Sequence, residues 1–220
     1  DNKVLIISHN PITTYNNMGK TLRALFQSFS EDELCQLYCY PNLPDIDVCS
    51  SYYRITDVDV LKSLFCFSRV KGREIKKSEI SEKNRQFENP DDENRYRTGK
   101  HYKRYLREII WKLAHWFNED LTAWIEEQKP TCIFVAPGDG EFLYDIALKI
   151  SQHYSLPIVT YICDDIFFSK APKGIFASVR YKRLKNKICD IVLPSEKMYP
   201  LCGYQGGNTM KNPTYNPSDA

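Results

Sequence analysis

The hydrophobic and polar positions of the central stretch, residues 131–165, follow the order of a strand, a helix and a second strand. Residues 132–136 form an unbroken apolar run, and residues 158–163 form another. Between the two runs, apolar side chains recur at roughly helical spacing, at Phe142, Ile146, Ile150 and Tyr154. The pattern therefore predicts one βαβ unit. Because strands this apolar on both faces belong to sheets covered by helices, we expect the two strands to be parallel.

Before this stretch, the chain shows the same alternation of apolar runs and amphipathic segments. Residues 4–7 predict a first strand, and a polar loop then leads to a helix with apolar side chains at Leu22, Leu25, Phe26 and Phe29. Residues 34–40 and 52–56 predict the second and third strands. We expect Asp57 to cap a short helix whose apolar residues are Val60, Leu61, Leu64 and Phe65.

The segment between the third strand and the central stretch has a charged part and an amphipathic part. Residues 69–99 carry dense alternating charge and few apolar side chains, which is typical of a solvated insertion. Residues 100–128 have apolar side chains at helical spacing along their whole length. They predict one long helix that ends at Lys129-Pro130.

After the central stretch, residues 176–187 predict another helix and residues 188–193 a further strand. The alternation of strands and helices fits an α/β fold, a Rossmann-like, doubly wound and mainly parallel sheet flanked by helices. We expect residues 1–202 to form this domain. Residues 203–220 contain a Gly-Gly pair and two Asn-Pro turn signals, and we expect them to be a linker or a truncated tail.

Composition narrows the class of protein without identifying it. Of the 220 residues, 42% are hydrophobic and 26% are charged, as in an ordinary globular domain, and the net charge is only +2. No apolar run approaches the ~20 residues that a membrane-spanning helix needs. The eight cysteines include no Cys-x-x-Cys pair, which argues against zinc ribbons and redox motifs. We therefore expect reduced thiols, no metal, and a cytoplasmic protein.

Polar residues follow the predicted strands at the edge where ligands bind in parallel sheets, beyond the carboxyl ends. These residues are His9 and Asn10, Gly138, Asp139 and Gly140, and Asp164 and Asp165. Adjacent residues on an extended chain point to opposite sides, so one of the two aspartates is expected to face a site, as a general base or polar anchor. A structural helix cap is the alternative. The other histidines, His101, His115 and His153, lie on predicted helices and are expected to be surface or core residues.

Gly19-Lys20-Thr21, at the start of the first predicted helix, matches the end of a phosphate-binding P-loop. The complete motif needs a glycine five positions before Gly19, where this chain has Thr14, so an ATPase or GTPase is not indicated. A polar loop that opens a helix with small residues still offers backbone N–H groups and a positive dipole end to an anion. The alternative is an ordinary helix start, capped by Asn16 or Asn17.

Two basic clusters stand out against the low net charge. The first contains Arg95, Arg97, Lys100, Lys103, Arg104 and Arg107, with tyrosines between them, and the second contains Lys170, Lys173, Arg180, Lys182, Arg183, Lys185 and Lys187. Such clusters suit an anionic membrane surface, where each basic side chain adds about 1 kcal/mol, or nucleic-acid phosphates. A solvated helix face is the simplest alternative. If the clusters are functional, we expect membrane and not nucleic acid as the partner, facing Arg104, Arg107, Lys182, Arg183 and Lys185.

Four segments of the chain carry a resemblance when they are taken in order. They are Ser8-His9-Asn10-Pro11, Asn16-Asn17-x-Gly19-Lys20-Thr21, Leu156-Pro157-Ile158-Val159 before Tyr161-Ile162-Cys163-Asp164-Asp165, and Cys189-Asp190-x-Val192-x-Pro194-Ser195-Glu196-x-Met198. The chain resembles in these segments the N-terminal half of bacterial glycosyltransferases of family 4 and their relatives with GT-B architecture. Within that group it is most similar to enzymes that build capsule or other surface polysaccharides.

The resemblance implies a site in a cleft between two Rossmann-like domains, the N-terminal one holding the acceptor and the C-terminal one most of the nucleotide-sugar. It implies that donor phosphates or acceptor are bound by His9, Asn10, Asn16, Asn17, Gly19, Lys20, Thr21, Gly138, Asp139, Ser195 and Glu196. Many members carry a histidine at the strand end where this chain has Cys163-Asp164. The resemblance therefore implies Asp164 as the substitute for the catalytic base, with Asp165 beside it.

The function implied is transfer of a sugar from a nucleotide-sugar to a lipid-linked or polysaccharide acceptor at the inner membrane surface, without a further cofactor. The family's C-terminal donor motif, two glutamates eight positions apart, has no counterpart here, so we expect little turnover without a C-terminal donor domain. The alternative is a non-catalytic Rossmann-like module that docks a membrane surface or a protein partner. A dehydrogenase is not indicated, because Gly-x-Gly-x-x-Gly is missing after the first strand. The cleft requires that the loops after Ile7, Ala136 and Ile162 converge on one edge of the sheet.

Overall fold

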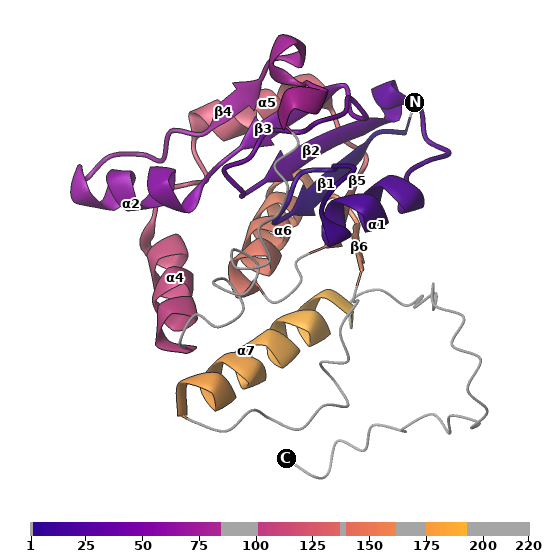
Figure 1. Ribbon diagram of the computed structural model, residues 1–220. Helices are drawn as coiled ribbons and strands as arrows, with labels where there is room; N and C mark the ends of the chain where they lie inside the picture. Colours follow the sequence, from indigo (N-terminus) through magenta and orange to yellow (C-terminus); the bar gives the residue numbers. More distant parts are fainter. Residues whose placement is uncertain (1, 85–100, 137–139, 162–174, 193–220) are drawn as a thin grey trace, which may run out of the picture.

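The computed structural model describes residues 2–84, 101–136, 140–161 and 175–192, and shows an α/β fold built on one six-stranded sheet (Figure 1). The strand order is β4-β3-β2-β1-β5-β6. Four of the neighbouring pairs are parallel, and only β3 and β4 are antiparallel. The strands are β1 Val4–Ser8, β2 Leu34–Tyr38, β3 Ser51–Arg54, β4 Arg73–Ile75, β5 Cys132–Ala136 and β6 Ile158–Thr160. The predicted Rossmann-like class, with a mainly parallel sheet flanked by helices, is thus confirmed.

Strand register brings the carboxyl ends of the central strands together. Ser8, the last residue of β1, pairs with Tyr38 on one side and with Ala136 on the other. On the next strand along, Thr160 pairs with Val135. The three loops expected to converge follow β1, β5 and β6. These strands are parallel neighbours, so all three end at the same edge of the sheet. Within those loops, residues 137–139 and 162–165 lie outside the described part of the chain.

Helices cover both faces of the sheet, and side chains alternate along β1 between two cores. Leu5 and Ile7 are buried in a core that also contains Trp111, Trp124 and residues of the helix after β5. Val4 and Ile6 are buried on the other face, under Leu22 and Phe26. The α-helices are α1 Asn17–Leu25, α2 Asp57–Phe65, α4 His101–Leu113, α5 Glu119–Gln128, α6 Glu141–Tyr154 and α7 Ile175–Val192. Short 3-10 turns cover Glu31–Glu33, Lys77–Glu79 and Glu82–Asn84.

The predicted single helix over 100–128 is wrong, because the chain breaks it between α4 and α5. Asn118 caps α5, its Oδ1 accepting from the N–H of Asp120 at 3.1 Å and of Leu121 at 3.4 Å. Its side-chain amide donates to Val70 O at 2.9 Å, which ties the break to the segment after α2. An asparagine that bonds backbone groups in this way competes with the continuous helix. The apolar spacing passes through the break, so periodicity alone does not reveal it.

Three further expectations are corrected. Residues 188–192 are the end of α7 and not a strand: Leu184, Ile188 and Ile191 are spaced as one helical stripe and pack against α6. A short run of apolar residues is compatible both with a strand and with the buried end of a helix. Hydrophobic periodicity therefore could not identify which of the two residues 188–192 form. Within the region expected to be a solvated insertion, residues 73–75 form the edge strand β4. The cap of α2 is Thr56, one residue before Asp57, in a capping box.

Half of the six described cysteines are buried apolar residues. Cys35, Cys39 and Cys49 are free and fully buried, whereas Cys66 is free and exposed. Burial raises the pKa of the Cys35 thiol to about 12. Cys163 and Cys202 lie outside the described residues. Among the helices that are described, none has the length and apolar character needed to cross a bilayer.

Candidate functional site

A histidine at the end of β1 is held by a chain of contacts from two other elements. An Nη2 hydrogen of Arg107, in α4, points to His9 Nε2 at 2.8 Å, and Arg107 Nε donates to Asp57 Oδ1, at the start of α2, at 2.9 Å. Trp111 Nε1 donates to the same Asp57 oxygen at 2.7 Å. Because a guanidinium only donates hydrogen bonds, His9 Nε2 is the acceptor. The ring proton therefore lies on Nδ1, which is 3.1 Å from Asn10 Oδ1 and donates to it.

Arg107 is enclosed by aromatic residues as well as by its polar partners. Its Cζ atom lies 4.6 Å from the centre of the Phe142 ring, and that ring stacks on Trp111 at 4.4 Å. The side chain of Arg107 is only 25% exposed. The guanidinium of Arg107 is thus engaged by Asp57 and His9 within the chain, and the expectation that it faces a membrane stays a prediction. The planar guanidinium group of an arginine can donate to Asp57 and His9 at the same time, which the single ammonium group of a lysine does less well.

The start of α6 receives a carboxylate from within the chain. Glu108, in α4, accepts the N–H of Glu141 at 3.0 Å and the N–H of Phe142 at 2.8 Å, and its side chain is buried. These N–H groups have no partner within α6, and the positive end of the helix dipole favours a negative charge beside them. In α/β folds, helix starts of this kind bind phosphate groups. Here, Glu108 occupies the two donors.

The loop after β1 is built around Asn16 and Gly19. Asn16 Oδ1 accepts the N–H of Gly19 at 2.5 Å, so Asn16 caps α1, which confirms this part of the structural interpretation. A Cβ atom at Gly19 would lie 2.2 Å from Thr13 Oγ1, so packing within the loop requires glycine here. Asn17 and Lys20 are exposed at the start of the helix. Anion binding by this loop stays a prediction. Thr21 bonds within the helix, its Oγ1 donating to Asn17 O at 3.0 Å.

A buried glutamine in β2 fixes the first part of the same loop. Gln36 Oε1 accepts the N–H of Ile12 at 3.1 Å, and Gln36 Nε2 donates to Ser8 Oγ at 2.8 Å. Farther along, the N–H of Thr14 donates to Asp45 Oδ1 at 3.0 Å. The loop is thus a bonded element and not a loose connection. Sequence reasoning missed Gln36, although a polar side chain inside an apolar strand run is the signal that could have found it.

The helices α4 and α7, which carry the described residues of the two basic clusters, pack against each other. Arg183 lies over the ring of Tyr105, with its Cζ 5.4 Å from the ring centre, and both Lys182 and Arg183 are exposed. Lys185 lies over Tyr181 at 4.6 Å, and Arg104 is partly buried. Several predicted site residues lie outside the described part of the chain: Gly138, Asp139, Asp164, Asp165, Ser195 and Glu196.

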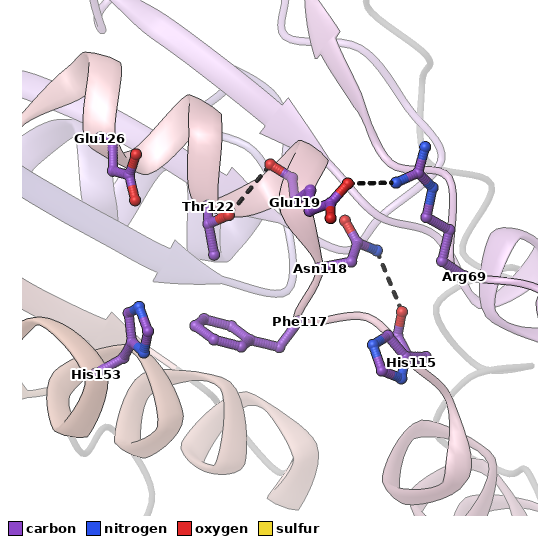
Figure 2. A pocket seen from close by; sticks show the side chains of 8 residues that line it. All are labelled: Arg69, His115, Phe117, Asn118, Glu119, Thr122, Glu126 and His153. Atoms are coloured by element: carbon purple, nitrogen blue, oxygen red, sulfur yellow. Dashed lines mark hydrogen bonds and ion pairs between the residues drawn. The ribbon is translucent and has the colours of Figure 1, made fainter.

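A separate cavity of about 410 Å³ lies at the opposite end of α6, next to the break between α4 and α5 (Figure 2). Its lining residues are Arg69, His115, Phe117, Asn118, Glu119, Thr122, Glu126 and His153. The Phe117 ring points toward His153, with the ring centres 5.1 Å apart, and Arg69 pairs with Glu119 at 3.1 Å. His115 and His153 are exposed, as expected of surface residues. The cavity is remote from the carboxyl edge of the sheet, because His153 is in the last turn of α6.

Within the described ranges, no three histidine, cysteine or acidic side chains gather in a way that could hold a metal ion. Comparison of the chain with protein-family models, with curated proteins and with solved structures finds no match. The candidate site at the carboxyl edge of the sheet therefore has three features. Arg107 binds a neutral His9, hydrogen bonds hold the loop before α1, and Glu108 accepts the backbone N–H groups at the start of α6.

Proposed function

We propose that this chain is the acceptor-binding half of a two-domain glycosyltransferase that moves a sugar from a nucleotide-sugar to a glycan or lipid-linked acceptor. The observation that carries the proposal is the bonded loop after β1, with His9 held by Arg107 at the edge where Rossmann-like sheets bind ligands. The ordered resemblance of the four segments to glycosyltransferases of family 4 supports it independently.

The filled start of α6 supports an acceptor half rather than a donor half. A nucleotide-sugar carries a diphosphate, and such groups bind at helix starts through free backbone N–H groups. Glu108 already accepts two of these groups at α6, and its negative charge would repel a diphosphate there. The donor diphosphate is therefore expected to bind mainly outside this chain. The exposed Lys20, at the start of α1, is our candidate for contact with it from this side.

The reaction is a displacement at the anomeric carbon of the donor sugar. An acceptor oxygen forms a bond to that carbon, the bond to the diphosphate oxygen breaks, and the nucleoside diphosphate leaves with the electron pair. The hydroxyl proton passes to a base, for which Asp164 is the candidate. Cationic groups stabilise the charge that develops on the diphosphate. Both nitrogens of His9 already have partners, so we assign His9 and Arg107 to positioning the loop and not to proton transfer.

The test uses the product of the complete gene that encodes this chain. Release of nucleoside diphosphate is measured with a panel of nucleotide-sugars, with and without a lipid extract of the source cells as acceptor. We expect one donor to give acceptor-dependent release, and Asp164→Asn to lower kcat by about 10²–10⁴-fold with an unchanged circular dichroism spectrum. Lys20→Ala should raise KM for the donor, and Glu119→Gln, far from the edge, is the matched control.

The alternative, a non-catalytic module, makes different predictions for the same experiment. It is favoured if the complete gene encodes no second α/β half, or if no donor in the panel is turned over. Full activity of the Asp164→Asn variant would remove the proposed base even if transfer is observed. The Arg107→Lys variant tests whether Arg107 positions the loop after β1 or only supports folding. A lower kcat with unchanged thermal stability supports the positioning role.

A further inference from the structure

Exposed apolar side chains gather on two neighbouring helices. Of the ten large apolar side chains that are exposed in the described part of the chain, six lie on α2, on the turn after it, or on α4. We name this set the α2–α4 apolar face; its members are Val58, Leu61, Phe65, Phe67, Leu106 and Leu113. Phe65 is 82% exposed and Phe67 is 99% exposed. A soluble monomer seldom leaves several large apolar side chains together in water, so the face indicates an interaction surface.

The spacing of these residues places them on the outer side of each helix. Val58, Leu61 and Phe65 follow each other at intervals of three and four residues, while Val60 and Leu64 of the same helix pack into the core. Leu106 and Leu113 are seven residues apart on α4 and share one face in the same way. Both sets are therefore outward stripes and not parts of the core.

The two stripes lie on neighbouring helices, because α2 and α4 are in contact. Near the start of α2, Arg107 Nε donates to Asp57 Oδ1 at 2.9 Å. Beyond its end, the N–H of Val70 donates to His115 O at 3.1 Å. Figure 1 shows both helices on the same side of the molecule.

Phe67 combines an exposed side chain with a backbone conformation that bulky residues disfavour. Its φ angle is 48°, in the left-handed region, which bulky side chains rarely adopt. The turn is closed by the N–H of Ser68, which donates to Ser63 O at 2.9 Å. Because its side chain is almost wholly exposed, Phe67 contributes little to the core. A left-handed residue that closes a helix in this way is a common helix ending, and here it leaves the Phe67 ring beside the outer stripe of α2.

The exposed charges on the same stripes are positive. Lys62 shares the outer side of α2 with Val58 and Phe65, and Lys103 lies three residues before Leu106 on α4; both are exposed, and neither forms an ion pair within the described residues. The acidic residues of these helices are engaged in hydrogen bonds within the chain. Asp57 binds Arg107 and Trp111, Asp59 bonds Thr56, and Glu108 binds the start of α6.

We propose that the α2–α4 apolar face enters the headgroup region of an anionic lipid bilayer, with Phe65 and Phe67 as the inserted residues. Apolar side chains flanked by lysines suit this environment, where insertion and attraction to anionic lipids act together. A second copy of the chain is a poorer occupant, because a self-paired face would bring lysines of like charge together. On α7, Arg183 lies over Tyr105 of α4, and the exposed charges of Lys182 and Arg183 would add to the attraction.

The experiment measures sedimentation of the full chain with phosphatidylcholine vesicles, with and without phosphatidylglycerol. The test variant is Phe65→Ser/Phe67→Ser. The matched control is Leu25→Ser/Phe29→Ser, which removes two exposed apolar side chains from the α1 region. We expect binding only with phosphatidylglycerol, weakened by salt, and reduced about tenfold or more in the test variant but not in the control. Lys62→Gln/Lys103→Gln should weaken binding to the vesicles that contain phosphatidylglycerol, and the binding that remains should depend less on salt.

Three results would overturn the proposal. The first is no binding of the wild-type chain to vesicles that contain phosphatidylglycerol. The second is equal loss of binding in the test and control variants. The third is a wild-type dimer that the test variant converts to a monomer in sedimentation velocity, which would assign the face to a second copy. None of these readouts depends on sugar transfer, so failure here and failure of the proposed function are distinguishable.

Discussion

Replacing Glu108 tests whether a carboxylate of α4 holds the start of α6. Glu108→Ala removes the acceptor of two buried N–H groups, those of Glu141 and Phe142. A hydrogen bond to a charged group contributes about 1.5–3 kcal/mol, and loss of a helix cap alone costs about 0.5–2 kcal/mol. These effects overlap, so we expect the free energy of unfolding to fall by about 3 kcal/mol. Glu108→Gln keeps one acceptor oxygen and should cost roughly half as much.

Urea unfolding followed by circular dichroism measures the loss. With a slope of about 3 kcal/mol per molar urea, the midpoint of Glu108→Ala should fall by roughly 1 M. Glu119→Gln is the control: it also removes a glutamate charge, in the first turn of α5, but the Glu119 side chain is 93% exposed and, among the described residues, forms an ion pair only with Arg69. That change should cost less than about 1 kcal/mol. If Glu108→Ala stays within about 0.5 kcal/mol of the wild type, the carboxylate does not hold α6 and the reasoning is refuted.

Two further predictions concern the loop before α1 and the buried thiols. Gly19→Ala should lower the free energy of unfolding by roughly 1–3 kcal/mol, because the new Cβ would lie 2.2 Å from Thr13 Oγ1; an unchanged melting temperature would contradict the packing described for this loop. Burial raises the pKa of the Cys35 thiol from the usual 9.0 to about 12. Above pH 9 the thiol ionises in the unfolded chain but not in the folded one, so the stability that the buried thiol contributes is complete below pH 9 and is lost as the pH rises toward 12. Unfolding measured across this range should show a shallower alkaline loss in Cys35→Ala than in the wild type, with Cys66→Ala as the exposed control; equal slopes would contradict the assignment.

Local patterns were sufficient where an element is defined by its own residues. The apolar runs at 4–7 and 132–136 became β1 and β5, and the helical spacing after Gly140 became α6. The break between α4 and α5 was missed because its cause, the bonding of Asn118 to Val70, joins residues far apart in the chain. The run at 188–192 was misassigned because its environment decides its type: Ile188 and Ile191 pack against α6, which is possible only from one side of a helix.

The sequence by itself determined the class of fold and the polar ends of its strands, because two-residue and 3.6-residue periods are local properties of the chain. Only the tertiary structure decided what the site residues contact. Arg107 binds His9, 98 positions away, and Asp57, 50 positions away. Glu108 occupies the start of α6 from 33 positions away. No local period encodes such pairs: they form because the sheet brings the ends of separate elements to one edge, where each buried charge must find a partner.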